Sequence, residues 1–66
     1  MPSPRAPLTE KDILLEFQQV GTIVRVNAID PRTNTEVTIQ GPASAGRAIL
    51  SHNAINKLNY VLRNKG

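Results

Sequence analysis

The sequence predicts an α+β fold: a three-stranded antiparallel β-meander followed by one C-terminal α-helix that packs on one face of the sheet. From residue 13 to residue 40, apolar and polar side chains alternate with the period of two that is typical of half-buried strands. Two turn signals divide this stretch into three strands. After Gly41 and Pro42 the apolar spacing changes to 3.6 residues, which indicates an amphipathic helix. The predicted order of elements is therefore β-β-β-α.

The first twelve residues are predicted to be a disordered N-terminal tail, which leaves residues 13–64 as a single domain. Three of the first seven residues are prolines, which disfavour both helix and sheet. Thr9 and Asp12 have the spacing of a capping box, but no helical apolar pattern follows them. We expect a turn there that leads into the first strand. Because no long apolar run is present, we expect no signal peptide or membrane anchor and a cytoplasmic location.

The first two strands have clear inner and outer faces. The inner residues are Ile13, Leu15 and Phe17 on the first strand and Val24, Val26 and Ala28 on the second. Inner residues are odd-numbered on the first strand and even-numbered on the second, so each facing pair must combine one of each. A two-residue turn at Val20-Gly21 would place Glu16 opposite Arg25. A four-residue loop ending at Gly21 would place Leu14 there instead, and we favour it because valine resists the positive φ of the tighter turn.

The segment from Asp30 to Asn34 is the clearest turn signal. Asp30 suits the first position of a type I turn, Pro31 suits the second, and asparagine tolerates the left-handed conformation that closes it. The third strand follows, with its inner residues at Thr35, Val37 and Ile39.

The helix is predicted to begin with Pro42 as its first residue or with Ser44 as its N-cap, and to run to about Asn64. Its inner stripe has helical spacing and comprises Ser44, Ala48, Ser51, Ile55, Leu58 and Leu62. The helix covers one face of the sheet, so the sequence leaves the other face without a second layer.

A chain of 66 residues with 39% hydrophobic residues and no cysteine has a thin core and no disulfide to support it. Self-association is a common way for so small a domain to bury more surface. The open sheet face carries the candidate contact residues Leu14, Ile23, Arg25 and Ile29. The first functional hypothesis is a non-enzymatic interaction module that homodimerises or binds a protein partner through this face or through an edge strand.

Catalysis and metal binding have little support in the sequence. His52 is the only histidine, and the neighbouring Ser51 projects about 100° away from it on a helix, so the two do not form a nucleophile and base pair. No cluster of histidine, cysteine or carboxylate ligands and no glycine-rich phosphate loop is present. We therefore expect no enzyme activity, no metal and no cofactor.

The charge distribution supports an alternative hypothesis, weak nucleic-acid binding. The net charge is +3, and all five acidic residues precede residue 37. The second half carries only basic charges, at Arg47, Lys57, Arg63 and Lys65. Such a segment attracts phosphate backbones, although four charges make a sparse patch.

Two short segments carry a resemblance to a known family. Val24-Arg25-Val26 and Gly41-Pro42-Ala43-Ser44-Ala45 are its most specific parts, within a similarity that spans roughly residues 13–63. The chain resembles a family of small uncharacterised alphaproteobacterial proteins, a domain of unknown function. The resemblance implies a compact bacterial cytoplasmic domain that is not an enzyme, and it implies no ligand or site.

Overall fold

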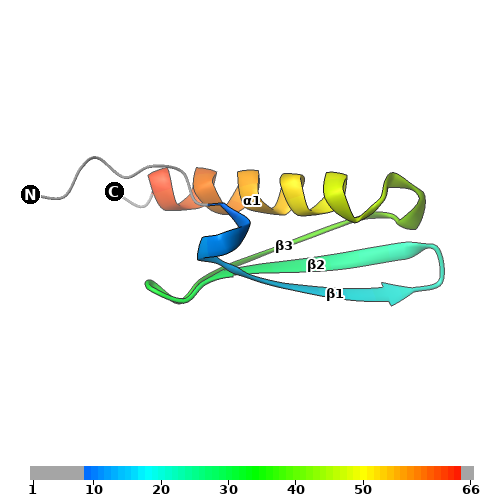
Figure 1. Cartoon of the computed structure of the whole chain (residues 1–66), viewed down its shortest axis with the longest axis horizontal. Helices are drawn as coiled ribbons and strands as arrows, with labels where there is room; N and C mark the ends of the chain where they lie inside the picture. Colours follow the sequence, from blue (N-terminus) through cyan, green and yellow to red (C-terminus); the bar gives the residue numbers. More distant parts are fainter. Residues whose placement is uncertain (1–8, 65–66) are drawn as a thin grey trace, which may run out of the picture.

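The computed structural model describes residues 9–64. The elements are η1 (Glu10–Asp12), β1 (Leu14–Val20), β2 (Ile23–Asp30), β3 (Thr35–Pro42), η2 (Ala43–Ala45) and α1 (Arg47–Asn64), where η marks a 3₁₀ helix. The strands form one antiparallel sheet in the order β1-β2-β3, and α1 lies along one face of it, against β2 and β3 (Figure 1). The predicted α+β meander with a C-terminal helix is confirmed.

The first hairpin corrects the predicted register. Val20 pairs with Ile23, so the connection is a two-residue turn at Gly21-Thr22. Both the favoured four-residue loop ending at Gly21 and the alternative two-residue turn at Val20-Gly21 are wrong. Gly21 has φ 61°, the positive value that the first position of a type II′ turn requires. Facing residues still combine odd with even numbers, as predicted. However, Arg25 lies opposite Gln18 rather than Leu14 or Glu16, because Val20 extends β1 and takes no part in the turn.

The second hairpin follows the prediction. Asp30 pairs with Thr35, and the four residues between them form the loop. Asn34 has φ 59°, the left-handed conformation expected of it, and its amide donates a 2.7 Å hydrogen bond to the Asp30 carbonyl. The turn chemistry of this segment is therefore sufficient to fix its geometry.

The core lies between the inner sheet face and α1. Val26, Ala28, Ala54 and Leu58 are fully buried. Within residues 9–64, the buried apolar cluster is Ile13, Val24, Val26, Ala28, Val37, Leu50, Ala54 and Leu58. The predicted inner face of the sheet is confirmed. Its inner residues on the central strand β2 are all buried, whereas Leu15 and Phe17 on β1 and Ile39 on β3 are only partly buried.

The start of the helix differs from the prediction. Neither Pro42 nor Ser44 begins α1, because β3 continues to Pro42 and η2 follows it. Gly46 has φ 89°, which is not a helical value, so η2 ends before it and α1 begins after it, at Arg47. Ser44 and Ala48 are exposed, so the first part of the predicted inner stripe is wrong. The buried helix residues are Leu50, Ser51, Ala54 and Leu58.

Residues 9–12, predicted as the end of the disordered tail with a turn into the first strand, form an ordered, capped turn. The Thr9 hydroxyl accepts a hydrogen bond from the Lys11 amide at 3.3 Å, and the Thr9 amide donates to Asp12 Oδ2 at 3.0 Å. These reciprocal bonds complete the capping box and hold η1 at the entrance to β1. The rest of the predicted tail, residues 1–8, lies outside the described residues.

Candidate functional site

The four candidate contact residues all project from the outer sheet face, and no described element covers this face. The register places Leu14 beside Ile29 in one cross-strand row, and Ile23 between Val20 and Pro42 in another. Leu14 is 57% exposed and Ile23 is 44% exposed. Val20, at 70%, is the most exposed large apolar residue in the described part of the chain. The sequence analysis missed Val20 because it placed this residue in the turn.

The apolar residues of the outer face do not form one patch. Ile23 and Ile29 lie near opposite ends of β2, about 20 Å apart at 3.3 Å per strand residue. Two polar rows separate them: Glu16, Asn27 and Thr38 in one, and Gln18, Arg25 and Gln40 in the other. A single molecule therefore presents two small apolar ends with a polar centre between them.

The free edge of β3 is partly closed. The Lys57 ammonium group on α1 donates a 3.1 Å hydrogen bond to the Thr38 carbonyl oxygen. At the end of the strand, Pro42 has no amide proton to offer. Lysine and proline are both devices by which natural sheets discourage the addition of another strand.

The free edge of β1 carries neither device. Because the two-residue turn bonds Val20 to Ile23, bonding to β2 alternates backwards along β1 from Val20. The backbone groups of Leu15, Phe17 and Gln19 therefore point away from β2. No described strand lies on that side, since β1 is the first strand in the sheet. The edge of β1 thus offers three N–H and three C=O groups to a partner strand.

A shallow groove runs beside this edge, between β1 and the first turns of α1. It has a volume of about 350 Å³ and is lined by Ile13, Leu15, Phe17, Arg47, Ala48 and Ser51. The Arg47 guanidinium carbon lies 3.9 Å from the centroid of the Phe17 ring, a cation–π contact. Leu15 and Phe17 form an apolar floor that α1 covers only in part.

The basic residues of α1 do not line up on one face. At about 100° per residue, Arg47, Lys57 and Arg63 project in directions about 80° to 160° apart. Arg47 stacks on Phe17 and Lys57 binds Thr38, so two of the three also have intramolecular partners. The fourth candidate, Lys65, lies outside the described residues.

The residues considered for catalysis remain apart. His52 is exposed, and its Nε2 lies 3.1 Å from the Asn56 amide nitrogen, whereas Ser51 is buried. Within residues 9–64, no three or more histidine, cysteine or acidic side chains are grouped as metal ligands would be. In the same part of the chain, no helix has both the length and the apolar character needed to cross a membrane.

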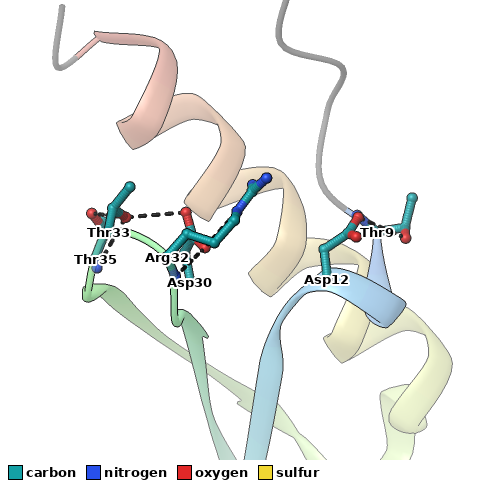
Figure 2. A network of polar contacts seen from close by, with 6 residues as sticks. All are labelled: Thr9, Asp12, Asp30, Arg32, Thr33 and Thr35. Carbon is teal, nitrogen blue, oxygen red and sulfur yellow. Dashed lines mark hydrogen bonds and ion pairs between the residues drawn. The ribbon is translucent and has the colours of Figure 1, made fainter. Parts of the chain in front are cut away.

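Asp30, the one buried carboxylate among the residues whose burial is described, holds the second hairpin loop (Figure 2). Its Oδ1 accepts hydrogen bonds from the Arg32 amide at 3.0 Å and from Arg32 Nε at 3.3 Å. Its Oδ2 accepts one from the Thr33 hydroxyl at 3.0 Å. Burial raises the pKa of Asp30, but these hydrogen bonds and the Arg32 charge outweigh it and leave the pKa below its ordinary value. All partners lie in the loop itself, so this network is structural.

The comparison with protein families decides the classification. Residues 10–65 match the model of the domain of unknown function DUF6898. The chain belongs to this family. Comparisons with curated proteins and with solved structures found no match. Membership in DUF6898 confirms the predicted resemblance to a domain of unknown function, and it assigns no activity or ligand.

Proposed function

We propose that this DUF6898 domain is a non-enzymatic protein-interaction module of the cytoplasm, and that it binds its partner along the open side of β1. The observation that carries the proposal is the difference between the two edges of the sheet. Lys57 and Pro42 obstruct the β3 edge, whereas the β1 edge leaves its outward backbone groups available.

The groove beside β1 supports the same surface. A strand added to a sheet edge gains affinity from main-chain hydrogen bonds and specificity from pockets for its alternate side chains. Leu15 and Phe17 offer such an apolar surface directly beside the open edge. A partner strand along β1 would therefore form main-chain hydrogen bonds with the outward groups of β1. Its side chains would contact the apolar groove beside them.

The outer sheet face has less support as a separate docking surface, because polar rows divide its apolar residues. Leu14 and Val20 lie on β1 itself, so a partner along this edge would contact them as well. Nucleic-acid binding through Arg47, Lys57 and Arg63 has less support again, since two of these three side chains contact the domain itself.

A site-specific photocrosslinker tests the proposal. Gln18 and Gln40 are both exposed, and both flank Arg25 in the same row of the outer face, but they lie on opposite edges. We expect a benzophenone side chain at Gln18 to crosslink a protein, in purified samples or in cell extract, and the same group at Gln40 to give little product. Equal crosslinking at both positions, or none at Gln18, would contradict the proposal.

A further inference from the structure

We infer that the partner of β1 is a second copy of this chain, whose β1 pairs antiparallel with the first around a two-fold axis at Phe17. This inference rests on the proposed function and names its partner. The product is a continuous six-stranded sheet with both helices on one face. Three features of β1 support this pairing: its hydrogen-bonding groups, its outer-face residues and its charges.

The outward backbone groups match their own copy. With Phe17 opposite Phe17 of the second copy, Leu15 lies opposite Gln19 of that copy, and Gln19 lies opposite its Leu15. These are the three residues of β1 whose N–H and C=O groups point away from β2. The pairing therefore uses all six outward groups of each copy, and all seven residues from Leu14 to Val20 are paired.

The same pairing joins the separated apolar ends of the outer face. Leu14 would lie opposite Val20 of the second copy. The row that begins with Ile29 and Leu14 would then continue through Val20 and Ile23 of that copy. Symmetry repeats this row at the other end of the joined sheet. The dimer thus combines half-exposed residues into two continuous apolar stripes, which neither molecule has alone.

Charges also favour this register. The row holding Arg25 and Gln18 would continue through Glu16 and Asn27 of the second copy, so the residue directly opposite each Glu16 would be the uncharged Gln18. A centre at Glu16 would instead place two carboxylates directly opposite each other, and like charges so placed are destabilising. A centre at Gln18 would shorten the paired segment. Only the centre at Phe17 pairs the whole strand without a like-charge contact.

The inner face would become continuous at the axis. The two Phe17 rings would lie side by side, each beneath its own Arg47, and the two grooves would meet between the helices. The partly buried Leu15 side chains would gain Gln19 of the other copy as a neighbour. In each copy, the β1 side of the core, which α1 covers only in part, would thus be covered by the same surface of the other copy.

Solution mass across a wide concentration range gives the first test. Gln19→Pro removes one outward amide on β1, and Gln40→Pro removes one outward amide on β3, one row away, so the two variants compare the two edges. We expect the wild type and Gln40→Pro to reach twice the monomer mass and Gln19→Pro to remain monomeric with native circular dichroism. A wild type that stays monomeric, or equal behaviour of the two variants, would overturn the inference.

Cysteine crosslinking determines which residues of the two β1 strands lie opposite each other. It does not require the fold to tolerate a proline in a strand. The chain has no cysteine, and Glu16 and Gln18 are exposed. We would mix Glu16→Cys and Gln18→Cys proteins in a glutathione redox buffer. Pairing at Phe17 places these two positions opposite each other, within disulfide distance. We expect the mixed disulfide to exceed the half share of random pairing. Dominant Glu16→Cys or Gln18→Cys homodimers, or no disulfide dimer, would overturn the inference. Crosslinking of a different protein at Gln18 would still support the proposed function.

Discussion

Replacing Leu58 with alanine is expected to leave a large fraction of the protein molecules unfolded at room temperature. Leu58 is fully buried, and its helix turn closes the core against the sheet. Removing a buried leucine side chain typically costs about 2–5 kcal/mol, because the lost burial and the remaining cavity both oppose folding. A core of this size rarely supplies more than about 3–5 kcal/mol in total. Urea denaturation followed by circular dichroism measures the loss.

Ile49→Ala is the matched control for this substitution. Ile49 is on the same helix but is 55% exposed, so its truncation is expected to change the stability by less than about 0.5 kcal/mol. Both variants should be compared at one protein concentration, because self-association would add to the apparent stability. If Leu58→Ala and Ile49→Ala unfolded at the same urea concentration, α1 would not pack on the sheet as described.

Removing the Asp30 carboxylate is expected to have the second largest effect. Asp30→Ala leaves the Arg32 amide without its acceptor and removes the bond from the Thr33 hydroxyl to Oδ2, although this hydroxyl keeps Thr35 Oγ1 as an acceptor at 2.8 Å. The loss at neutral pH is expected to be about 1–3 kcal/mol. Arg32→Ala is the milder control, because it keeps the backbone amide bond and removes only the guanidinium contact. The free energy of unfolding of the three proteins, measured at neutral pH, gives the comparison.

Acid is expected to remove the same contribution from the wild type. Since the pKa of Asp30 is lower in the folded state than the ordinary value of 3.8, the unfolded chain binds the proton first as the pH falls. The contribution of Asp30 is therefore complete above that value and is lost as the pH falls through the lower, folded pKa. The stabilities of wild type and Asp30→Ala should converge in that range. A constant difference down to the lowest pH would show that the carboxylate charge does not stabilise the loop.

Most of the fold follows from the sequence because each strand buries one face. Alternation identified the inner residues of all three strands, and Asp30 and Asn34 fixed the second turn. The first turn was misplaced because Val20 was assigned to the loop, whereas the type II′ turn has Gly21 in its first position and leaves Val20 as the last residue of β1. The helix start was misplaced because Pro42 and Ser44 satisfy local capping rules, whereas the actual start depends on β3 running beside β2 as far as Ile23.

The candidate site was predicted only in part. Alternation placed Leu14, Ile23, Arg25 and Ile29 on the outer face, but it did not show that they lie at separate ends. The difference between the two edges could not be predicted, because it depends on where the helix lies over the sheet. Lys57 reaches Thr38 across 19 residues of sequence, and no local pattern indicates such a contact.

The most direct test of the β1 dimer is residue-resolved amide hydrogen exchange at two protein concentrations. Pairing at Phe17 predicts that the outward amides of Leu15, Phe17 and Gln19 exchange slowly at high concentration and faster on dilution. The outward amides of β3, at Glu36, Thr38 and Gln40, should exchange rapidly at both concentrations. Rapid exchange of the three β1 amides at every concentration, or concentration-dependent protection on β3 instead, would contradict the account.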